Sequence, residues 1–240
     1  MTLTVGSLFS GIGGLELGLE RAGMKVIWQS EIDPYACKVL AKHWPKVPNH
    51  GNIKDIKWGT VVRPDVICGG YPCQPFSTAG KRQGKNDPRH LWPWVREAIS
   101  QLRPRYAVLE NVRGHLTLGG TTLIGELAAI GYDAEWRVVS ATSVGGLHKR
   151  ERIIIVAYPQ VFNVEKQKMV ASTKRRSPLQ PRGVWGASVP APHWPTNEPR
   201  MDRMVNGVSD WVDRSRGLGN AVVPQVAEVI GRLVMAHAHN

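Results

Sequence analysis

Short apolar runs of the kind found in β-strands alternate along the chain with segments whose apolar residues recur at helical spacing. This alternation is typical of an α/β protein, in which helices cover both faces of a mostly parallel sheet. The predicted strands are Leu3–Phe9, Val26–Ser30, Asp65–Cys68, Tyr106–Glu110, Trp136–Ser140 and Arg152–Ala157. The predicted helical stripes are formed by Trp92, Val95, Ile99 and Leu102, by Leu123, Leu127 and Ile130, and by Val226, Val229, Ile230 and Leu233.

Irregular, proline-rich sequence interrupts this pattern after residue 157. Seven of the seventeen prolines fall between Pro159 and Pro199, and three basic residues follow one another at 174–176. Proline lacks the amide hydrogen that a sheet requires, so we expect an irregular basic insert there. The insert is either a linker or a small substrate-recognition module, and Trp185 and Trp194 favour the module. The expected organisation is a core domain over 1–157, a small recognition region over 158–205 and a segment over 206–240 that returns to the core.

The chain carries a large excess of positive charge. Its 240 residues include 31 Lys and Arg against 19 Asp and Glu, which gives a net charge of +12. Such an excess predicts attraction to a polyanion, most simply nucleic acid, and argues against an enzyme confined to small neutral metabolites. No apolar run approaches the roughly 20 residues that span a bilayer, and the first residues do not form a secretory signal. The three cysteines fit neither a disulfide framework nor a metal site, so we expect a cytoplasmic protein without a metal centre.

A glycine-rich turn follows the first predicted strand. It reads Phe9-Ser10-Gly11-Ile12-Gly13-Gly14 and leads into a predicted helix. Glycines at such a turn let a ligand approach the backbone, although a plain tight turn has the same appearance. A dinucleotide fingerprint needs a glycine where Glu16 stands, which disfavours a nicotinamide dehydrogenase. Glu31 closes the second strand about twenty residues on, and an acid there typically binds ribose hydroxyls, so an adenosine-containing ligand is indicated.

A cysteine flanked by prolines follows the third predicted strand, in the segment Gly69-Gly70-Tyr71-Pro72-Cys73-Gln74-Pro75-Phe76-Ser77. Open α/β sheets place their sites at the carboxyl ends of strands, where this loop begins. A thiolate at Cys73 is therefore a candidate nucleophile. Cys37 and Cys68 are expected to be small buried side chains instead.

Charged residues mark the next strands of the predicted sheet. Glu110, followed by Asn111, ends one strand, and a carboxyl group there either caps a turn or donates a proton when burial raises its pKa. Arg150 and Arg152 enter the last predicted strand, where alternate residues share a face. Two guanidinium groups on one face suit a phosphate, a carboxylate or a carbonyl oxygen, unless they belong to a solvated strand end.

Taken in order, these motifs resemble the DNA cytosine-5 methyltransferases, in a compact bacterial or phage form. The resemblance rests on FSGIGGLELGLE, Glu31, GGYPCQPFS, ENV, KRER before an apolar strand, and GNAVVPQ, and it leaves out only the insert. It implies the Rossmann-like fold of S-adenosylmethionine-dependent methyltransferases, with a small irregular target-recognition insert. It also implies methyl transfer from S-adenosylmethionine to C5 of a cytosine flipped out of double-stranded DNA, which leaves S-adenosylhomocysteine.

The resemblance assigns roles to individual residues. Cys73 attacks C6 of the cytosine and Glu110 contacts its N3 edge. Arg150 and Arg152 hold the base oxygen, the acid and a nearby phosphate. The residues implied to touch DNA are Gln74, Ser77 and Asn111, together with both arginines. The residues implied to bind the cofactor are Phe9, Gly11, Gly13, Glu31, Ile32, Asn52, Ile53, Leu91, Asn220 and Val222.

Three features depart from the family pattern. An acid is usual where Asn52 stands, but an amide oxygen also accepts a hydrogen bond, so a modest loss of cofactor affinity at most is expected. Glutamine is common where His148 stands. The insert is short for a recognition domain, and it gives no register from which a DNA sequence could be derived.

Three other functions remain open at this point. A tRNA- or RNA-directed cytosine-5 methyltransferase shares the proline–cysteine loop. A non-catalytic DNA-binding protein on the same fold has no need of a nucleophile, and a dehydrogenase is disfavoured by Glu16 and by the loop around Cys73. No obligate protein partner and no membrane are expected, and a cognate restriction enzyme is the candidate partner.

Overall fold

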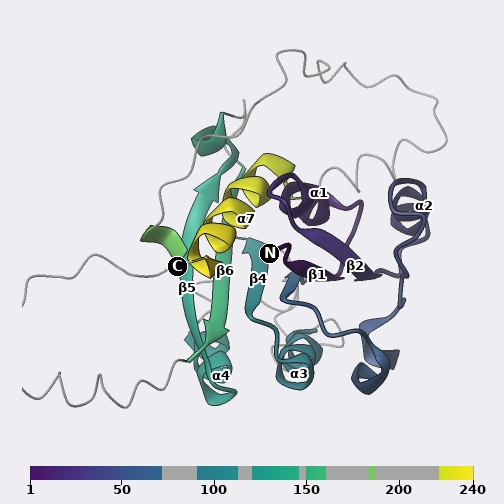
Figure 1. Cartoon of the computed structure of the whole chain (residues 1–240), viewed down its shortest axis with the longest axis horizontal. Helices are drawn as coiled ribbons and strands as arrows, with labels where there is room; N and C mark the ends of the chain where they lie inside the picture. Colours follow the sequence, from purple (N-terminus) through teal and green to yellow (C-terminus); the bar gives the residue numbers. More distant parts are fainter. Residues whose placement is uncertain (72–90, 113–120, 146–149, 161–183, 187–221, 240) are drawn as a thin grey trace, which may run out of the picture.

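In a computed structural model of the chain, residues 1–71, 91–112, 121–145, 150–160, 184–186 and 222–239 are described. Their six strands form one sheet in the order β2-β1-β3-β4-β6-β5 (Figure 1). β2, β1, β3 and β4 are parallel, whereas β6 runs antiparallel to both of its neighbours. The strands are β1 (Thr4–Leu8), β2 (Lys25–Ser30), β3 (Val66–Gly70), β4 (Tyr106–Val112), β5 (Tyr132–Ser140) and β6 (Glu151–Pro159). The predicted fold class and all six predicted strands are confirmed, with shifted ends.

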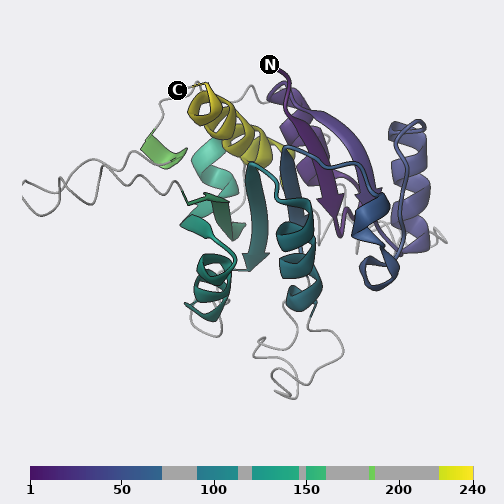
Figure 2. The same ribbon diagram turned by 60° about the horizontal axis from the view of Figure 1, so that its bottom comes forward.

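Helices cover both faces of this sheet. α1 and α7 lie on one face and α3 and α4 on the other, while α2 lies beyond the edge strand β2 (Figure 2). The α-helices are α1 (Gly14–Arg21), α2 (Pro34–His43), α3 (Trp92–Leu102), α4 (Thr121–Ala129) and α7 (Pro224–Ala238). The short 3₁₀ helices are η1 (Ile53–Asp55), η2 (Trp58–Thr60), η6 (Ala141–Val144) and η7 (Val184–Gly186). Among the described residues, no helix has the length and apolar character needed to cross a membrane.

The central strands are buried on both faces, which explains their continuous apolar sequences. In β3, Val66 and Cys68 face the core beneath α1 and α7, and Ile67 faces the core beneath α3 and α4. In β6, Ile154 and Ile155 divide in the same way. Two apolar cores therefore sandwich one sheet.

The predicted helical stripes pack against these cores, with small differences. The four stripe residues of α3, Trp92, Val95, Ile99 and Leu102, are all buried. Leu123 and Leu127 of α4 are buried, but Ile130 comes just after the helix ends. In α7, Val229 is only half-buried while Val226, Ile230 and Leu233 are buried.

The α2 helix is absent from the elements predicted from the sequence, although it has clear start signals. Asp33 caps it by accepting a hydrogen bond from the Ala36 amide at 2.9 Å, and Pro34 follows at the first helical position. Only Ala36 and Leu40 of this helix are buried. Because so few residues of α2 are buried, its apolar residues do not form a helical spacing that can be recognised in the sequence.

The first and last of the described helices touch along glycine residues. A Cβ on Gly18 of α1 would lie 2.3 Å from the Pro224 carbonyl oxygen and 2.4 Å from the Ala227 Cβ. A Cβ on Gly231 of α7 would lie 2.6 Å from the Ala22 Cβ. The two backbones therefore approach more closely than larger side chains allow, and α7 returns to the core beside α1, as expected of the last segment. The boundary expected at residue 157 falls inside β6, and the division into domains stays a prediction.

Candidate active site

The candidate site lies where β1, β3 and β4 end and β6 begins. β6 is antiparallel, so its first residues lie at the edge where the parallel strands finish. Arg152 in β6 pairs with Val112 in β4, two register positions from the Glu110–Ile154 pair, so Arg152 and Ile154 lie on the same side of β6. The topology thus brings an arginine from a strand start beside a glutamate from a strand end.

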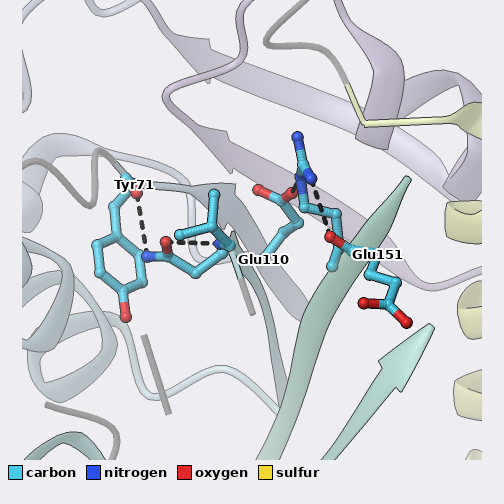
Figure 3. A network of polar contacts seen from close by, with 6 residues as sticks. Tyr71, Glu110 and Glu151 are labelled. Atoms are coloured by element: carbon cyan, nitrogen blue, oxygen red, sulfur yellow. Dashed lines mark hydrogen bonds and ion pairs between the residues drawn. The ribbon is translucent and has the colours of Figure 1, made fainter. Parts of the chain in front are cut away.

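Glu110 and Arg152 form an ion pair at this edge (Figure 3). The Glu110 Oε1 atom lies 2.8 Å from the Arg152 Nε atom, and the two side chains are only 10% and 23% exposed. Burial raises the pKa of Glu110 above its ordinary value, and the charges of Arg152 and Arg150 oppose that shift without cancelling it. Burial also lowers the pKa of Arg150, with the nearby Arg152 as the second cause. The structure therefore brings together all three of these predicted residues.

A glycine in the neighbouring strand makes room for the Glu110 carboxyl group. Gly70 ends β3 and pairs with Glu110 across the ladder. A Cβ on Gly70 would lie 2.9 Å from the Glu110 Oε2 atom. Any larger residue at position 70 would therefore displace the carboxyl group.

Asn111 contacts Tyr71, the last described residue before Cys73. Its Nδ2 atom donates to the Tyr71 carbonyl oxygen at 3.2 Å, and its Oδ1 atom accepts from the Val112 amide at 2.8 Å (Figure 3). The Tyr71 ring packs against Trp92 at the start of α3, with ring centroids 5.7 Å apart. Asn111 therefore has a structural contact, and the DNA contact expected of it stays a prediction.

The glycine turn after β1 has a left-handed backbone at three positions. Phe9, Gly11 and Gly13 have φ values of 53°, 55° and 88°. This conformation is uncommon for any residue other than glycine, so Phe9 is an outlier of the kind that gathers at ligand sites. Among the described residues, a Cβ on Gly11 would meet no atom within 4 Å, whereas one on Gly13 would lie 2.4 Å from the Trp44 ring. The turn is therefore open at Gly11 and closed by Trp44 at Gly13.

Glu31 ties the end of β2 to this turn. Its Oε2 atom accepts from the Gly11 amide at 2.7 Å, and its Oε1 atom accepts from the amides of Ile32 and Asp33, both at 2.8 Å. Beside it the apolar Ile32 side chain is 67% exposed. Carboxylate oxygens, an exposed apolar side chain and an open backbone turn fit an adenosine-containing ligand such as S-adenosylmethionine.

Two further predicted cofactor residues are attached to the same edge. The Ser30 hydroxyl donates to the Gly51 carbonyl oxygen at 2.7 Å, which holds the following Asn52 and Ile53 near the end of β2. Asn52 caps η1 by accepting from the Lys54 amide at 3.1 Å, and Ile53 is buried.

The remaining predicted residues lie elsewhere or are not described. Leu91 stands at the N-cap of α3, and Val222 is buried with its carbonyl oxygen against Gly14 of α1. Cys73, Gln74, Ser77, His148 and Asn220 lie outside the described residues.

Two features of the site were not recognised in the sequence. Glu16 is fully buried, accepts from the Ser7 hydroxyl at 2.5 Å, and has a pKa raised by burial. Its signal in the sequence was an acid inside an apolar helix face, which was interpreted only as a break in a dinucleotide motif. Cys68 is buried as predicted, but Cys37 is half-buried and its thiol donates to the Glu31 carbonyl oxygen at 3.4 Å. The expectation that Cys37 is a small buried side chain is therefore wrong.

Comparison with known proteins agrees with this geometry. Residues 3–206 match the family described as C-5 cytosine-specific DNA methylase, and the chain belongs to that family. The type II methyltransferase M.BsuFI of Bacillus subtilis is 37% identical over 161 residues, which are 65% of this chain and 39% of that protein. M.Eco47II of Escherichia coli is 41% identical over 165 residues, which are 64% of this chain and 39% of that protein. The matched stretch is thus well under half of these relatives.

Solved structures agree on the fold. A mutant of DNMT2 from Spodoptera frugiperda superimposes with a TM-score of 0.58 and 24% identity, over 68% of this chain and 51% of the other. The Dnmt2 methyltransferase of S. pombe superimposes with a TM-score of 0.56 and 20% identity, over 72% of this chain and 57% of the other. At this level of identity the similarity establishes the Rossmann-like methyltransferase fold and nothing finer.

Proposed function

We propose that this chain is a DNA cytosine-5 methyltransferase that uses S-adenosylmethionine and acts on a cytosine flipped out of a short sequence in double-stranded DNA. The observation that carries the proposal is the buried Glu110–Arg152 pair at the sheet edge that also holds the glycine turn and Glu31. A site for a base and a site for an adenosine-containing ligand then share one edge. The net charge of +12 suits a nucleic-acid substrate. We place the reaction in the cytoplasm.

The Glu110 carboxyl group is suited to hold a proton against the N3 edge of cytosine. Its pKa is raised by burial, so it retains a proton more readily than an exposed glutamate. Arg152 fixes the Oε1 atom and leaves the Oε2 atom, which faces Gly70, for the base. Arg150 and Arg152 supply guanidinium donors for the base oxygen and a phosphate.

The nucleophile in this proposal is Cys73. Its thiolate forms a bond to C6, the electron pair of the C5=C6 bond moves into the ring, and the proton from Glu110 neutralises N3. S-adenosylmethionine, when bound, supplies the methyl group that C5 receives. A base then removes the C5 proton, the electron pair of that C–H bond re-forms the C5=C6 bond, the thiolate leaves C6, and N3 returns its proton to the Glu110 carboxylate. Gln74, Ser77 and Asn111 are proposed as contacts to the DNA around the flipped base.

The cofactor is proposed to lie across the ends of β1 and β2. The Glu31 Oε1 atom uses its lone pairs on the amides of Ile32 and Asp33, whereas the Oε2 atom accepts only from the Gly11 amide among the described residues and keeps a lone pair for a ribose hydroxyl. Ile32 offers an apolar surface to the adenine, and Asn52 offers an amide oxygen to its amino group. The other proposed cofactor contacts are Phe9, Gly11, Gly13, Ile53, Leu91, Asn220 and Val222. Residues 158–205 are proposed to read the DNA sequence.

Methyl transfer tests this proposal directly. The whole chain is incubated with S-adenosylmethionine carrying a labelled methyl group, with double-stranded DNA and tRNA in separate reactions. We expect label at C5 of cytosine in DNA, and no label with Cys73→Ala. A duplex that carries 5-fluorocytosine is expected to trap a covalent adduct with the wild-type chain, because fluorine cannot leave C5 as a proton does. Label in tRNA alone, or undiminished transfer by Cys73→Ala, would contradict the proposal.

A further inference from the structure

The Asn49 side chain makes four hydrogen bonds near Glu31, although Asn49 lies at the surface. Its Oδ1 atom accepts from the amides of Glu31 and Gly51, both at 3.0 Å. Its Nδ2 atom donates to the Glu31 carbonyl oxygen at 3.1 Å and to the Cys37 Sγ atom at 3.3 Å. An asparagine amide has two donor hydrogens and one oxygen with two lone pairs, so this set uses all of them.

These bonds join segments that no regular ladder connects. The chain around Asn49 meets β2 through an isolated bridge, Gln29 to Asn49, in which the Gln29 amide donates to the Pro48 carbonyl oxygen and the His50 amide donates to the Gln29 carbonyl oxygen. The Ser30 hydroxyl adds its bond to the Gly51 carbonyl oxygen. β2 itself ends at Ser30. Beyond that point, the Asn49 side chain connects the Glu31 backbone to Gly51 on one side and to α2, through Cys37, on the other.

Asn49 forms hydrogen bonds with both polar backbone atoms of Glu31, the amide and the carbonyl oxygen. Because the Glu31 backbone is held in this way, the direction of the Glu31 side chain depends mainly on its own torsion angles. The Glu31 carboxylate accepts a hydrogen bond from the Gly11 amide in the glycine turn. Through its second Oδ1 bond, Asn49 also sets where Gly51, and after it Asn52 and Ile53, begin. One side chain thus adjusts two walls of the site proposed for the adenosine part of the cofactor.

We propose that Asn49 is a positioning residue for cofactor binding, which acts through Glu31 on the ribose hydroxyls without touching the cofactor itself. This inference rests on the proposed function, because it takes Glu31 as the acceptor for those hydroxyls. A residue that only stabilised the loop would change the affinity for every adenosine ligand equally. A residue that aims Glu31 affects the ligands that carry ribose hydroxyls most.

The experiment compares two ligands in the whole chain. Dissociation constants are measured by calorimetry for S-adenosylhomocysteine and for its 2′,3′-dideoxy analogue. We expect Asn49→Ala to weaken S-adenosylhomocysteine about tenfold, as the loss of one or two hydrogen bonds would, and the dideoxy analogue less than twofold. Turnover at saturating S-adenosylmethionine is expected to stay within about twofold, while its KM rises in line with the lost affinity.

Two more variants keep the test independent of folding. Asn49→Asp keeps the acceptor bonds to Glu31 and Gly51 but loses both donations, and the same selective loss is expected. The matched control is Thr60→Ala, because the Thr60 hydroxyl is also exposed and makes a local bond, to the Lys57 carbonyl oxygen at 2.8 Å in η2. Its affinities for both ligands are expected to match those of the wild-type chain.

The possible results separate the two proposals. Equal weakening of both ligands by the Asn49 variants, or weakening of neither, overturns the role of Asn49 while leaving the proposed function intact. A wild-type chain that does not bind S-adenosylhomocysteine overturns the proposed function and the inference with it. A wild-type chain that binds both ligands equally well overturns the role of Glu31, and therefore that of Asn49, but leaves methyl transfer from S-adenosylmethionine possible.

Discussion

The glycine contact between α1 and α7 predicts that one added methyl group destabilises the protein. In a helix interior, alanine in place of glycine normally stabilises by about 1 kcal/mol. At Gly18 the new Cβ would lie 2.3 Å from the Pro224 carbonyl oxygen, 2.4 Å from the Ala227 Cβ and 2.8 Å from the Glu228 amide nitrogen. Overpacking costs about 1–3 kcal/mol, and the upper end applies because the obstacle is mostly backbone. Gly18→Ala is therefore expected to lower the free energy of unfolding by about 2 kcal/mol.

A second helical glycine supplies the control. Gly125 lies on the exposed side of α4, and a Cβ there would meet no atom within 4 Å in the part of the chain that the structure describes. Gly125→Ala is expected to raise the free energy of unfolding by about 1 kcal/mol, because only helix propensity changes. Both variants and the wild-type chain are unfolded in urea and followed by circular dichroism, and midpoints and slopes are compared. If Gly18→Ala proves as stable as the wild-type chain, the close approach of α1 and α7 is wrong.

Three further predictions concern buried side chains. The pKa of Glu16 is raised by burial, so between the ordinary value of 4.5 and the higher folded value the unfolded chain loses its proton first and stability falls as pH rises. Glu16→Gln has no such loss. The free energy of unfolding of this variant minus that of the wild-type chain, measured by urea titration, is therefore expected to increase from pH 5 to pH 8, and a constant difference would contradict this. Arg152→Met leaves the Glu110 carboxyl group without its ion pair, which typically costs about 3–5 kcal/mol; the loss is expected to be larger at pH 8 than at pH 6, because Glu110 escapes part of it by taking up a proton. Leu127→Ala removes a fully buried side chain and should cost about 2–5 kcal/mol, whereas Leu17→Ala at the exposed side of α1 should change thermal stability little.

The strands were predictable because most of them are buried on both faces. Ile153 to Val156 in β6 form an unbroken apolar run. A short run of this kind, bounded by residues that favour turns, is typical of a buried strand. The start of β5 was placed too late, at Trp136, since β5 is an edge strand whose first residues alternate between the buried Tyr132 and charged neighbours. α2 was missed for the opposite reason, because little of its surface is buried.

The candidate site was partly predictable from the sequence, whereas the side chains that support it were not. Glu110 and Arg152 were found because strand ends and alternate strand residues have a fixed geometry. The contact of Asn49 with Glu31 depends on how a loop of irregular sequence folds back onto β2, which no periodicity encodes. The burial of Glu16 depends likewise on how closely α1 approaches Ser7 in β1.

The pairing of α1 with α7 has a consequence for how the protein forms during synthesis. β1, α1 and β3 leave the ribosome long before α7, which supplies much of the apolar surface that covers them. Until Val226, Ile230 and Leu233 emerge, part of one face of the nascent sheet stays open to water and to other chains. Contacts between segments so distant in sequence form slowly, so we expect this face to need shielding by a chaperone while translation is completed.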